Sequence, residues 1–117
     1  MKNRPFHIRL GFALRGLAHA FRVESAFRFH VLATCGVLVV LLIVRPAPIW
    51  WAIAGLTVTA VLAAELFNTA VENLVDHLHP ELHPRVRIVK DCAAAAVLTI
   101  AVGALCIAAA FVYDNLL

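Results

Sequence analysis

The sequence predicts an all-α protein embedded in a membrane, with an N-terminal amphipathic surface helix and three transmembrane helices. Hydrophobic residues make up 63% of the 117 residues and charged residues only 15%, whereas soluble domains are nearer half apolar and a quarter charged. The basic residues are also segregated, because all except Arg45 lie within residues 2–28 or 85–90. A water-soluble monomer of this size could not bury so much apolar surface. We therefore expect one membrane-embedded domain over residues 1–117.

The first element is expected over residues 6–28, where apolar side chains recur every three or four positions. Basic residues lie between them, and this pattern predicts an amphipathic helix on the membrane surface. A cytosolic helix that packs on the rest of the chain fits the pattern nearly as well. No cleavable signal peptide is expected, because the region before the first apolar run is too long and too charged. The recurring apolar residues are Phe6, Leu10, Leu14, Leu17 and Phe21.

Three apolar runs predict membrane spans over about residues 29–45, 49–75 and 91–113. The first run, "FHVLATCGVLVVLLIV", is slightly short for a span, but arginines at both ends can reach the interface. Two tryptophans open the second run, as interfacial aromatic residues do. The third run is uncharged and rich in alanine, which suits close helix packing in lipid. The short link "RPAP" predicts a tight hairpin between the first two spans.

The distribution of Lys and Arg predicts the orientation of the chain. The N-terminal segment and the loop over residues 77–90 are basic and should be cytoplasmic, which puts the C-terminus outside. Nucleic-acid binding is not favoured, because no basic patch carries interleaved aromatic residues. The odd number of cysteines argues against a disulfide framework, so buried membrane thiols are expected instead. These cysteines are Cys35, Cys92 and Cys106.

The stretch "AELFNTAVENLVD", residues 64–76, places carboxylates at the end of an apolar helix. At 100° per residue, four of its polar positions fall within an arc of about 80° on one helix face. Ionisable groups at membrane depth usually face a protein interior and mark function. They suit either a general base beside a metal ligand or a proton or cation relay. A structural role is the alternative, above all for the last of them. The four residues are Glu65, Asn68, Glu72 and Asp76.

Other charged residues favour the first of these two uses. Glu24 is the only acid in the basic N-terminal segment, so it could supply an oxygen from a second helix. Lys90 and Asp91 open the third span, and a lysine beside an aspartate at the membrane surface suits a polyphosphate. An interface anchor is the alternative role for Lys90.

Three segments together resemble the prokaryotic diacylglycerol kinase family, which includes the undecaprenol kinases. "AELFNTAVENLVD" is similar to the family signature E-x-x-N-[ST]-A-x-E-x-x-x-D, and "VKDCAAAAVL" is similar to its K-D-x-[AG]-[AS]-A-A-V-L segment. "GFALRGLAHAFRVESAFRFH" resembles the family's N-terminal surface helix. The resemblance covers roughly residues 6 to 112, in the same order and spacing.

The resemblance implies a homotrimeric lipid kinase of the bacterial cytoplasmic (inner) membrane. Such an enzyme transfers the γ-phosphate of ATP to a lipid hydroxyl at the cytoplasmic interface. Glu65 would be the general base that takes the proton from that hydroxyl. Glu24 and Glu72 would ligate Mg²⁺ bound with ATP and would thereby contact the nucleotide. The chemistry agrees, because phosphoryl transfer depends mainly on positioning and on neutralising phosphate charge.

The resemblance also implies further site residues. Those that would hold the nucleotide are Glu81, His83, Lys90 and Asp91. Those with a supporting or substrate-contacting role would be Arg15, Arg28, His30, Asn68 and Asp76.

Two positions bear on the lipid substrate. The Gram-negative diacylglycerol kinase pattern has glutamate where this chain has His30, and a histidine there is more similar to the undecaprenol kinase branch. That branch usually has asparagine two residues after the glutamate, where this chain has Ala26. Diacylglycerol, giving phosphatidic acid, is the first expected substrate, and undecaprenol, giving undecaprenyl phosphate, is the close alternative.

Two other classes of protein remain as alternatives. A small proton-coupled transporter or channel would use Glu65 and Glu72 as a relay near the bilayer midplane, but here they follow about sixteen apolar residues and precede a basic loop. A structural or assembly subunit would tolerate loss of Glu65. The loop histidines have a spacing compatible with zinc, but solvated or nucleotide-side histidines are the preferred interpretation. These histidines are His77, His79 and His83.

Overall fold

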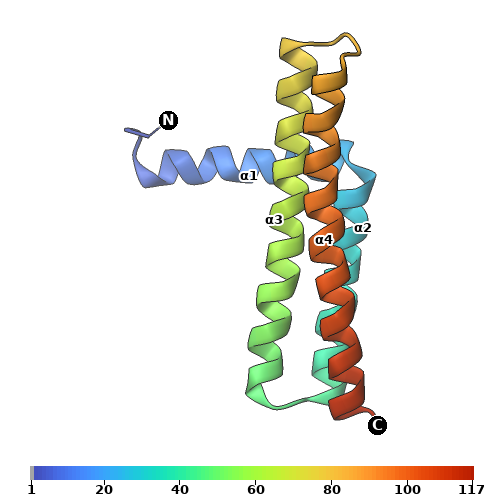
Figure 1. Cartoon of the computed structure of the whole chain (residues 1–117). Coiled ribbons are helices and arrows are strands. Elements are labelled where there is room, and N and C mark those ends of the chain that lie inside the picture. The colour runs from blue at the N-terminus through green and yellow to red at the C-terminus, as the bar shows by residue number, and fades with distance from the viewer. Residues whose placement is uncertain (1) are drawn as a thin grey trace.

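The computed structural model describes residues 2–117, and every regular element in this range is a helix (Figure 1). Helices α2, α3 and α4 form an upright bundle in which α3 packs against both of the others, and α1 lies across the bundle. Each of the three bundle helices is long and apolar enough to cross a membrane. The all-α class is therefore confirmed, and three helices have the length and composition expected of the predicted spans. The helices are α1 (Phe6–Val23), α2 (Ser25–Val44), α3 (Pro48–Leu78) and α4 (Pro84–Asn115).

The first two helices meet at a break that the sequence did not indicate. A surface helix was expected over residues 6–28, but α1 ends at Val23 and α2 begins at Ser25. Between them, Glu24 has an extended backbone with φ −109° and ψ 110°. Residues 25–28 therefore belong to α2, and the chain turns from one helix direction into the other at Glu24.

Arg28 stabilises this turn from the α2 side. Its Nη1 atom donates hydrogen bonds to the backbone oxygens of Phe21 and Arg22, at 2.8 and 2.9 Å. The last carbonyls of a helix have no partner within that helix, and a cation near them also interacts favourably with the helix dipole. The break needs no glycine or proline, because a side chain of the following helix caps α1.

The opposite end of the bundle is held by a short link and a cross-helix contact. Arg45 ends α2 in the left-handed backbone region, with φ 50°, and Pro48 opens α3 at a position where proline is favoured. The Nε1 atom of Trp50 donates a hydrogen bond to Oδ2 of Asp114 at 2.8 Å, and its ring packs edge-on against Phe111. The α2–α3 link and the C-terminus thus lie at the same end (Figure 1).

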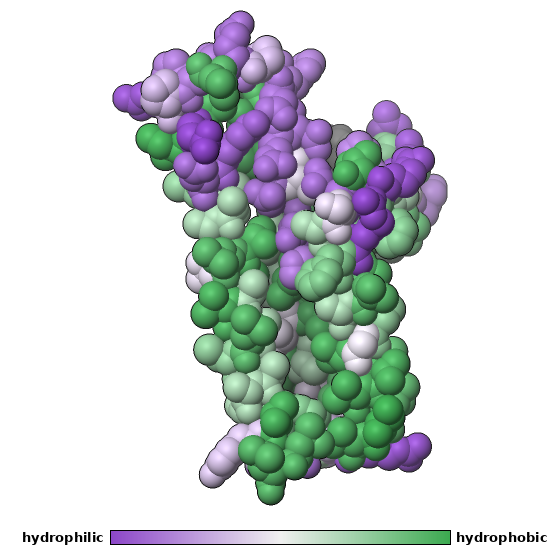
Figure 2. Space-filling model, turned by 90° about the vertical axis from the view of Figure 1, so that its right-hand side faces the viewer, coloured by the Kyte–Doolittle hydropathy of each residue, from purple (hydrophilic) through white to green (hydrophobic). Residues whose placement is uncertain are grey.

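The bundle helices differ in length, and the excess lies at one end. Helix α2 has 20 residues, whereas α3 has 31 and α4 has 32. At 1.5 Å per residue, α3 is about 16 Å longer than α2. Because α3 begins where α2 ends, the α3–α4 pair extends past α1 (Figure 1). We call residues 70–95 the projecting hairpin. Hydrophilic side chains cover this end in Figure 2, and hydrophobic ones cover most of the rest of that face.

Few side chains are buried within the described residues. The buried ones belong to α1, α2 and α3, and α4 contributes none. Large apolar side chains point outward along the spans, among them Ile43, Leu56 and Leu105, which are 76%, 73% and 70% exposed. An apolar surface this continuous is not found on soluble monomers, and it fits a chain solvated by lipid. The buried residues are Ala20, Phe27, Leu41, Val61, Glu65 and Thr69.

Candidate functional site: a carboxylate face on helix α3

The four residues of the predicted polar face, Glu65, Asn68, Glu72 and Asp76, lie on one continuous helix. Helix α3 has no interruption between Glu65 and Asp76, so the arc of about 80° expected from helical geometry applies to the structure. Exposure increases along this face. Glu65 is 5% exposed, Asn68 and Glu72 are partly exposed, and Asp76 is exposed. The face therefore runs from the interior of the bundle into the projecting hairpin.

Glu65 is paired with a residue of the neighbouring helix. Its Oε1 atom lies 3.2 Å from Nε2 of His30, which comes from α2, and the two side chains are 6% and 21% exposed. Burying a carboxylate is unfavourable unless a partner is close. Among residues 2–117, His30 is the one basic side chain within 4 Å of a Glu65 oxygen. The structure therefore brings together the expected base and one of the expected supporting residues.

Asn68 lies one turn beyond Glu65 and has an unused acceptor. Its Oδ1 atom is buried without a hydrogen-bond partner in the described structure. Leaving a buried acceptor unpaired costs about 1–3 kcal/mol, so a native chain normally provides a donor from water or a ligand. The neighbouring Thr69 is 6% exposed, and its carbonyl accepts a hydrogen bond from Nδ2 of Asn73 at 2.9 Å. This part of the face is suited to receive a polar group from outside the chain.

Two ion pairs lie on the projecting hairpin. Nζ of Lys90 is 2.5 Å from Oδ1 of Asp76 and joins α4 to α3. On α4, Nε of Arg87 is 3.4 Å from Oδ1 of Asp91. Both residues that were expected to hold the nucleotide from α4 are thus engaged with a side chain of opposite charge. The partnership with Arg87 was not expected from the sequence, although the spacing of four residues on a helix is a signal for it.

The other expected nucleotide residues lie in the loop between α3 and α4. Nδ1 of His83 accepts a hydrogen bond from the backbone N–H of Arg85 at 3.1 Å, so His83 caps the start of α4. Glu81 is exposed, and its carbonyl lies 3.0 Å from Nδ1 of His79. The His79 and His83 rings are 5.6 Å apart and nearly edge-on. The Nδ1 atoms of both histidines therefore contact backbone groups near the loop.

The candidate metal ligands do not form a complete site within the described part of the chain. No group of three or more His, Cys, Asp or Glu side chains within residues 2–117 is placed to hold a metal ion. Glu24 and Glu72 are both partly exposed and offer oxygen ligands of the kind Mg²⁺ prefers. Protein sites for Mg²⁺ use one or two carboxylates together with phosphate oxygens. The two glutamates fit such a site in their chemistry, provided that phosphate supplies the remaining ligands.

The expected supporting arginines lie on or beside α1. Arg28 caps the end of α1, as described above. Arg15 is exposed, and its guanidinium lies 5.0 Å from the centre of the Phe12 ring. Neither arginine contacts a carboxylate of the α3 face in this structure.

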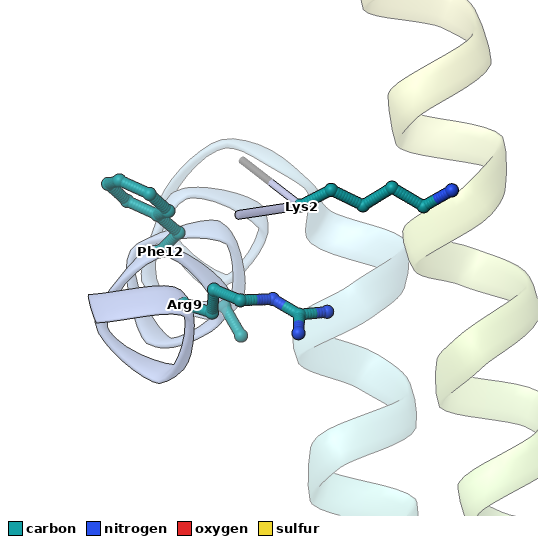
Figure 3. Close-up of a pocket in the computed structure, with 4 residues that line it drawn as sticks. Lys2, Arg9 and Phe12 are labelled. Carbon is teal, nitrogen blue, oxygen red and sulfur yellow. The ribbon is translucent and has the colours of Figure 1, made fainter. Parts of the chain in front are cut away.

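Two hollows adjoin α1. One, of about 470 Å³, lies between α1 and α3, and Thr69 and Asn73 are on its α3 side. Most of its lining is small or apolar: Ala13, Gly16, Leu17, Ala20, Leu66 and Ala70. The other hollow, of about 370 Å³, lies nearer the start of α1 and is lined by Lys2, Arg9, Phe12 and Ala13. In Figure 3 the side chains of Lys2 and Arg9 extend to the same side, and the Phe12 ring points away from them.

Comparison with known proteins agrees with these features. The family model described as prokaryotic diacylglycerol kinase matches residues 11–112. An undecaprenol kinase of Bacillus subtilis is 39% identical over 88 residues, which are 75% of this chain and 72% of that protein. A diacylglycerol kinase of Synechocystis is 33% identical over 107 residues, 91% of this chain and 61% of that protein. A diacylglycerol kinase of Haemophilus influenzae is 33% identical over 96 residues, 82% of this chain and 78% of that protein.

The matched region contains almost the whole helical framework and the complete carboxylate face. It begins within α1 and ends within α4, so all three membrane-competent helices contribute to it. The helices and the bacterial relatives together indicate a bacterial multi-pass membrane protein. The chain belongs to the prokaryotic diacylglycerol kinase family.

Proposed function

We propose that the chain transfers the γ-phosphoryl group of ATP to the hydroxyl of a membrane lipid, with diacylglycerol as the expected substrate. The observation that carries this proposal is the carboxylate face of α3, which joins a buried Glu65 to an exposed Asp76 on one unbroken helix. A lipid hydroxyl approaches from the membrane, whereas a nucleotide approaches from water. A reaction between them needs one site that both can reach, and a face that runs from the bundle interior to the exposed end of α3 supports the proposal.

Glu65 is proposed as the general base. It lies at the inner, buried end of the face. A base must come within hydrogen-bond reach of the proton that it removes. Asn68, with its unpaired Oδ1, is proposed to orient the hydroxyl or the phosphate.

The outer part of the face is proposed to bind the phosphates. Lys90 and Asp91 lie on α4 in the projecting hairpin and provide a cation and an acid, and Lys90 is paired with Asp76 of α3. Glu24 and Glu72 would hold Mg²⁺, which when bound neutralises phosphate charge during transfer. Glu81 and His83 would stand beside the nucleotide at the loop, and Arg15 near the lipid headgroup.

The proposal includes a homotrimer in the cytoplasmic membrane. Helix α4 has no buried residue in the single chain and carries many small side chains, which suits helix packing in lipid. Glu24 of one chain could then complete the site of another. The N-terminus and the projecting hairpin would be cytoplasmic, as the distribution of Lys and Arg predicts.

Undecaprenol is the second candidate substrate. The observation that favours it is His30, which contacts Glu65 directly and occupies the position where the sequence resembles the undecaprenol kinase branch. The relative named undecaprenol kinase also shares the higher identity with this chain, 39% against 33% for the two diacylglycerol kinases. The phosphoryl chemistry would be unchanged.

A proton-coupled transporter is the alternative from a different class. It would need ionisable groups that continue across the bilayer. Residues 46–64, which precede Glu65 along the chain, carry no formal charge. The ion pairs among the described residues involve either Glu65 itself or residues of the projecting hairpin. The charged residues favour chemistry at one interface.

The test is transfer of labelled phosphate from ATP in detergent micelles that contain both diacylglycerol and undecaprenol. Label in one lipid supports the kinase and identifies the substrate. Glu65→Gln should nearly abolish turnover while ATP binding persists, because the base is lost and the nucleotide contacts remain. Label in neither lipid, with folded protein and Mg²⁺ present, would contradict the proposal.

A further inference from the structure

The contact between His30 and Glu65 joins two helices at the buried end of the carboxylate face. His30 is the sixth residue of α2, and Glu65 lies in the second half of α3. Nε2 and Oε1 are 3.2 Å apart, and both side chains are largely shielded from solvent. The contact involves one carboxylate oxygen. Within residues 2–117 no further hydrogen bond or ion pair to Glu65 is found.

The other titratable side chains on the neighbouring helices do not contact this pair. On α2, the guanidinium of Arg28 is bound to backbone oxygens of α1. On α4, Lys90 is paired with Asp76. His19 of α1 lines the groove beside Thr69. Glu24 and Glu72 are partly exposed acids at the α1–α2 turn and on α3. Among the described residues, His30 is therefore the one titratable side chain that contacts Glu65.

We propose that His30 is a positioning residue for Glu65, holding Oε1 so that Oε2 is the oxygen that accepts the proton of the lipid hydroxyl. This inference rests on the proposed kinase function. A donor at Oε1 fixes the orientation of the carboxylate, which is how a partner of a catalytic group usually contributes.

Each bond that forms in the proposed step is matched by a bond that breaks. The lipid O–H bond breaks as its oxygen forms a bond to the γ-phosphorus, and the hydroxyl proton moves to Oε2 of Glu65. The bond between the γ-phosphorus and the bridging oxygen breaks, and its electron pair leaves with ADP. Glu65 then releases the proton to water. His30 keeps its contact with Oε1 throughout and contacts neither substrate.

The experiment compares His30→Ala and His30→Gln with the native chain in the micelle assay. We expect His30→Ala to lower kcat on the order of 10- to 100-fold, as loss of a partner that orients a functional ligand does. The KM for ATP and for lipid should change less than about twofold, because His30 touches neither substrate. His30→Gln, which can still donate to Oε1, should regain much of the lost rate. His7→Ala removes an exposed imidazole of α1 and should leave kcat unchanged.

The comparison of the two variants separates positioning from a packing role. If His30 positions Glu65, kcat falls in His30→Ala and recovers in His30→Gln, which keeps a donor for Oε1. Equal loss of kcat in both variants would show a packing role alone, and that result would overturn the inference. A raised KM for lipid with unchanged kcat would also overturn it, because His30 would then contact the lipid headgroup.

A measurement that does not depend on turnover is a double-mutant cycle on thermal unfolding in detergent. His30→Ala and Glu65→Ala should each lower Tm, and the double variant should lower it by less than the sum, because neither partner is then left buried alone. Additive shifts would refute the pairing. A native chain that phosphorylates neither lipid would instead refute the proposed function, so the two failures are distinguishable.

Discussion

Lys90→Met tests whether the projecting hairpin binds the nucleotide or only stabilises the fold. Nζ of Lys90 lies 2.5 Å from Asp76, and the two side chains are 33% and 62% exposed. An ion pair with this exposure contributes about 0.2–1 kcal/mol to stability. Methionine keeps most of the apolar stem, so the free energy of unfolding should fall by less than about 1 kcal/mol.

The effect on ATP should be larger than the effect on folding. A hydrogen bond between a lysine and a phosphate oxygen contributes about 1.5–3 kcal/mol. Its loss should weaken ATP binding about 10- to 150-fold, which raises the KM for ATP in the micelle assay. Thermal unfolding of the same samples measures stability. Asp76→Asn is the matched control, because it removes the same ion pair and keeps the cation.

Two results would refute this reasoning. If Lys90→Met and Asp76→Asn raise the KM for ATP equally, the ion pair matters and the phosphate contact does not. If Lys90→Met unfolds the chain while the loss of Asp76 does not, Lys90 has a structural role that its exposure does not indicate.

The remaining predictions concern the metal and the turn at Glu24. Glu72→Gln should raise the Mg²⁺ concentration needed for half-maximal activity, because one oxygen ligand loses its charge, and an unchanged Mg²⁺ titration would remove Glu72 from the site. Arg28→Ala loses two hydrogen bonds to the end of α1 and should destabilise the chain by about 1 kcal/mol, given their exposure. Amide hydrogen exchange should then increase in the last turn of α1, and equal protection in both proteins would show that the cap is not needed.

The helical architecture was predictable because long apolar runs admit few structures in lipid. A backbone without water must satisfy its hydrogen bonds internally, so residues such as those from 92 to 113 are restricted to a helix. The break at Glu24 was not predictable in this way. It depends on Arg28 reaching back to two carbonyls, and neither a proline nor a glycine marks it. The apolar pattern also could not show how far α3 and α4 continue past the ends of their apolar runs.

The candidate site was also predictable only in part. Helical periodicity alone placed Glu65, Glu72 and Asp76 on one face, because the positions are on a single element. The contacts of Asp76 with Lys90 and of Glu65 with His30 join different helices. They depend on how those helices pack, which local spacing does not specify. The roles of these residues in binding and catalysis remain predictions for the experiments above.

The unbroken helix α3 restricts where residues can be inserted or deleted. Glu65 and Asp76 are eleven residues apart on an unbroken helix, which corresponds to a rise of about 16 Å. Inserting or deleting one residue between them would rotate every later side chain by about 100° and shift it by about 1.5 Å. Length variation should therefore be excluded between Glu65 and Asp76, because no break in this part of α3 could absorb the change in register.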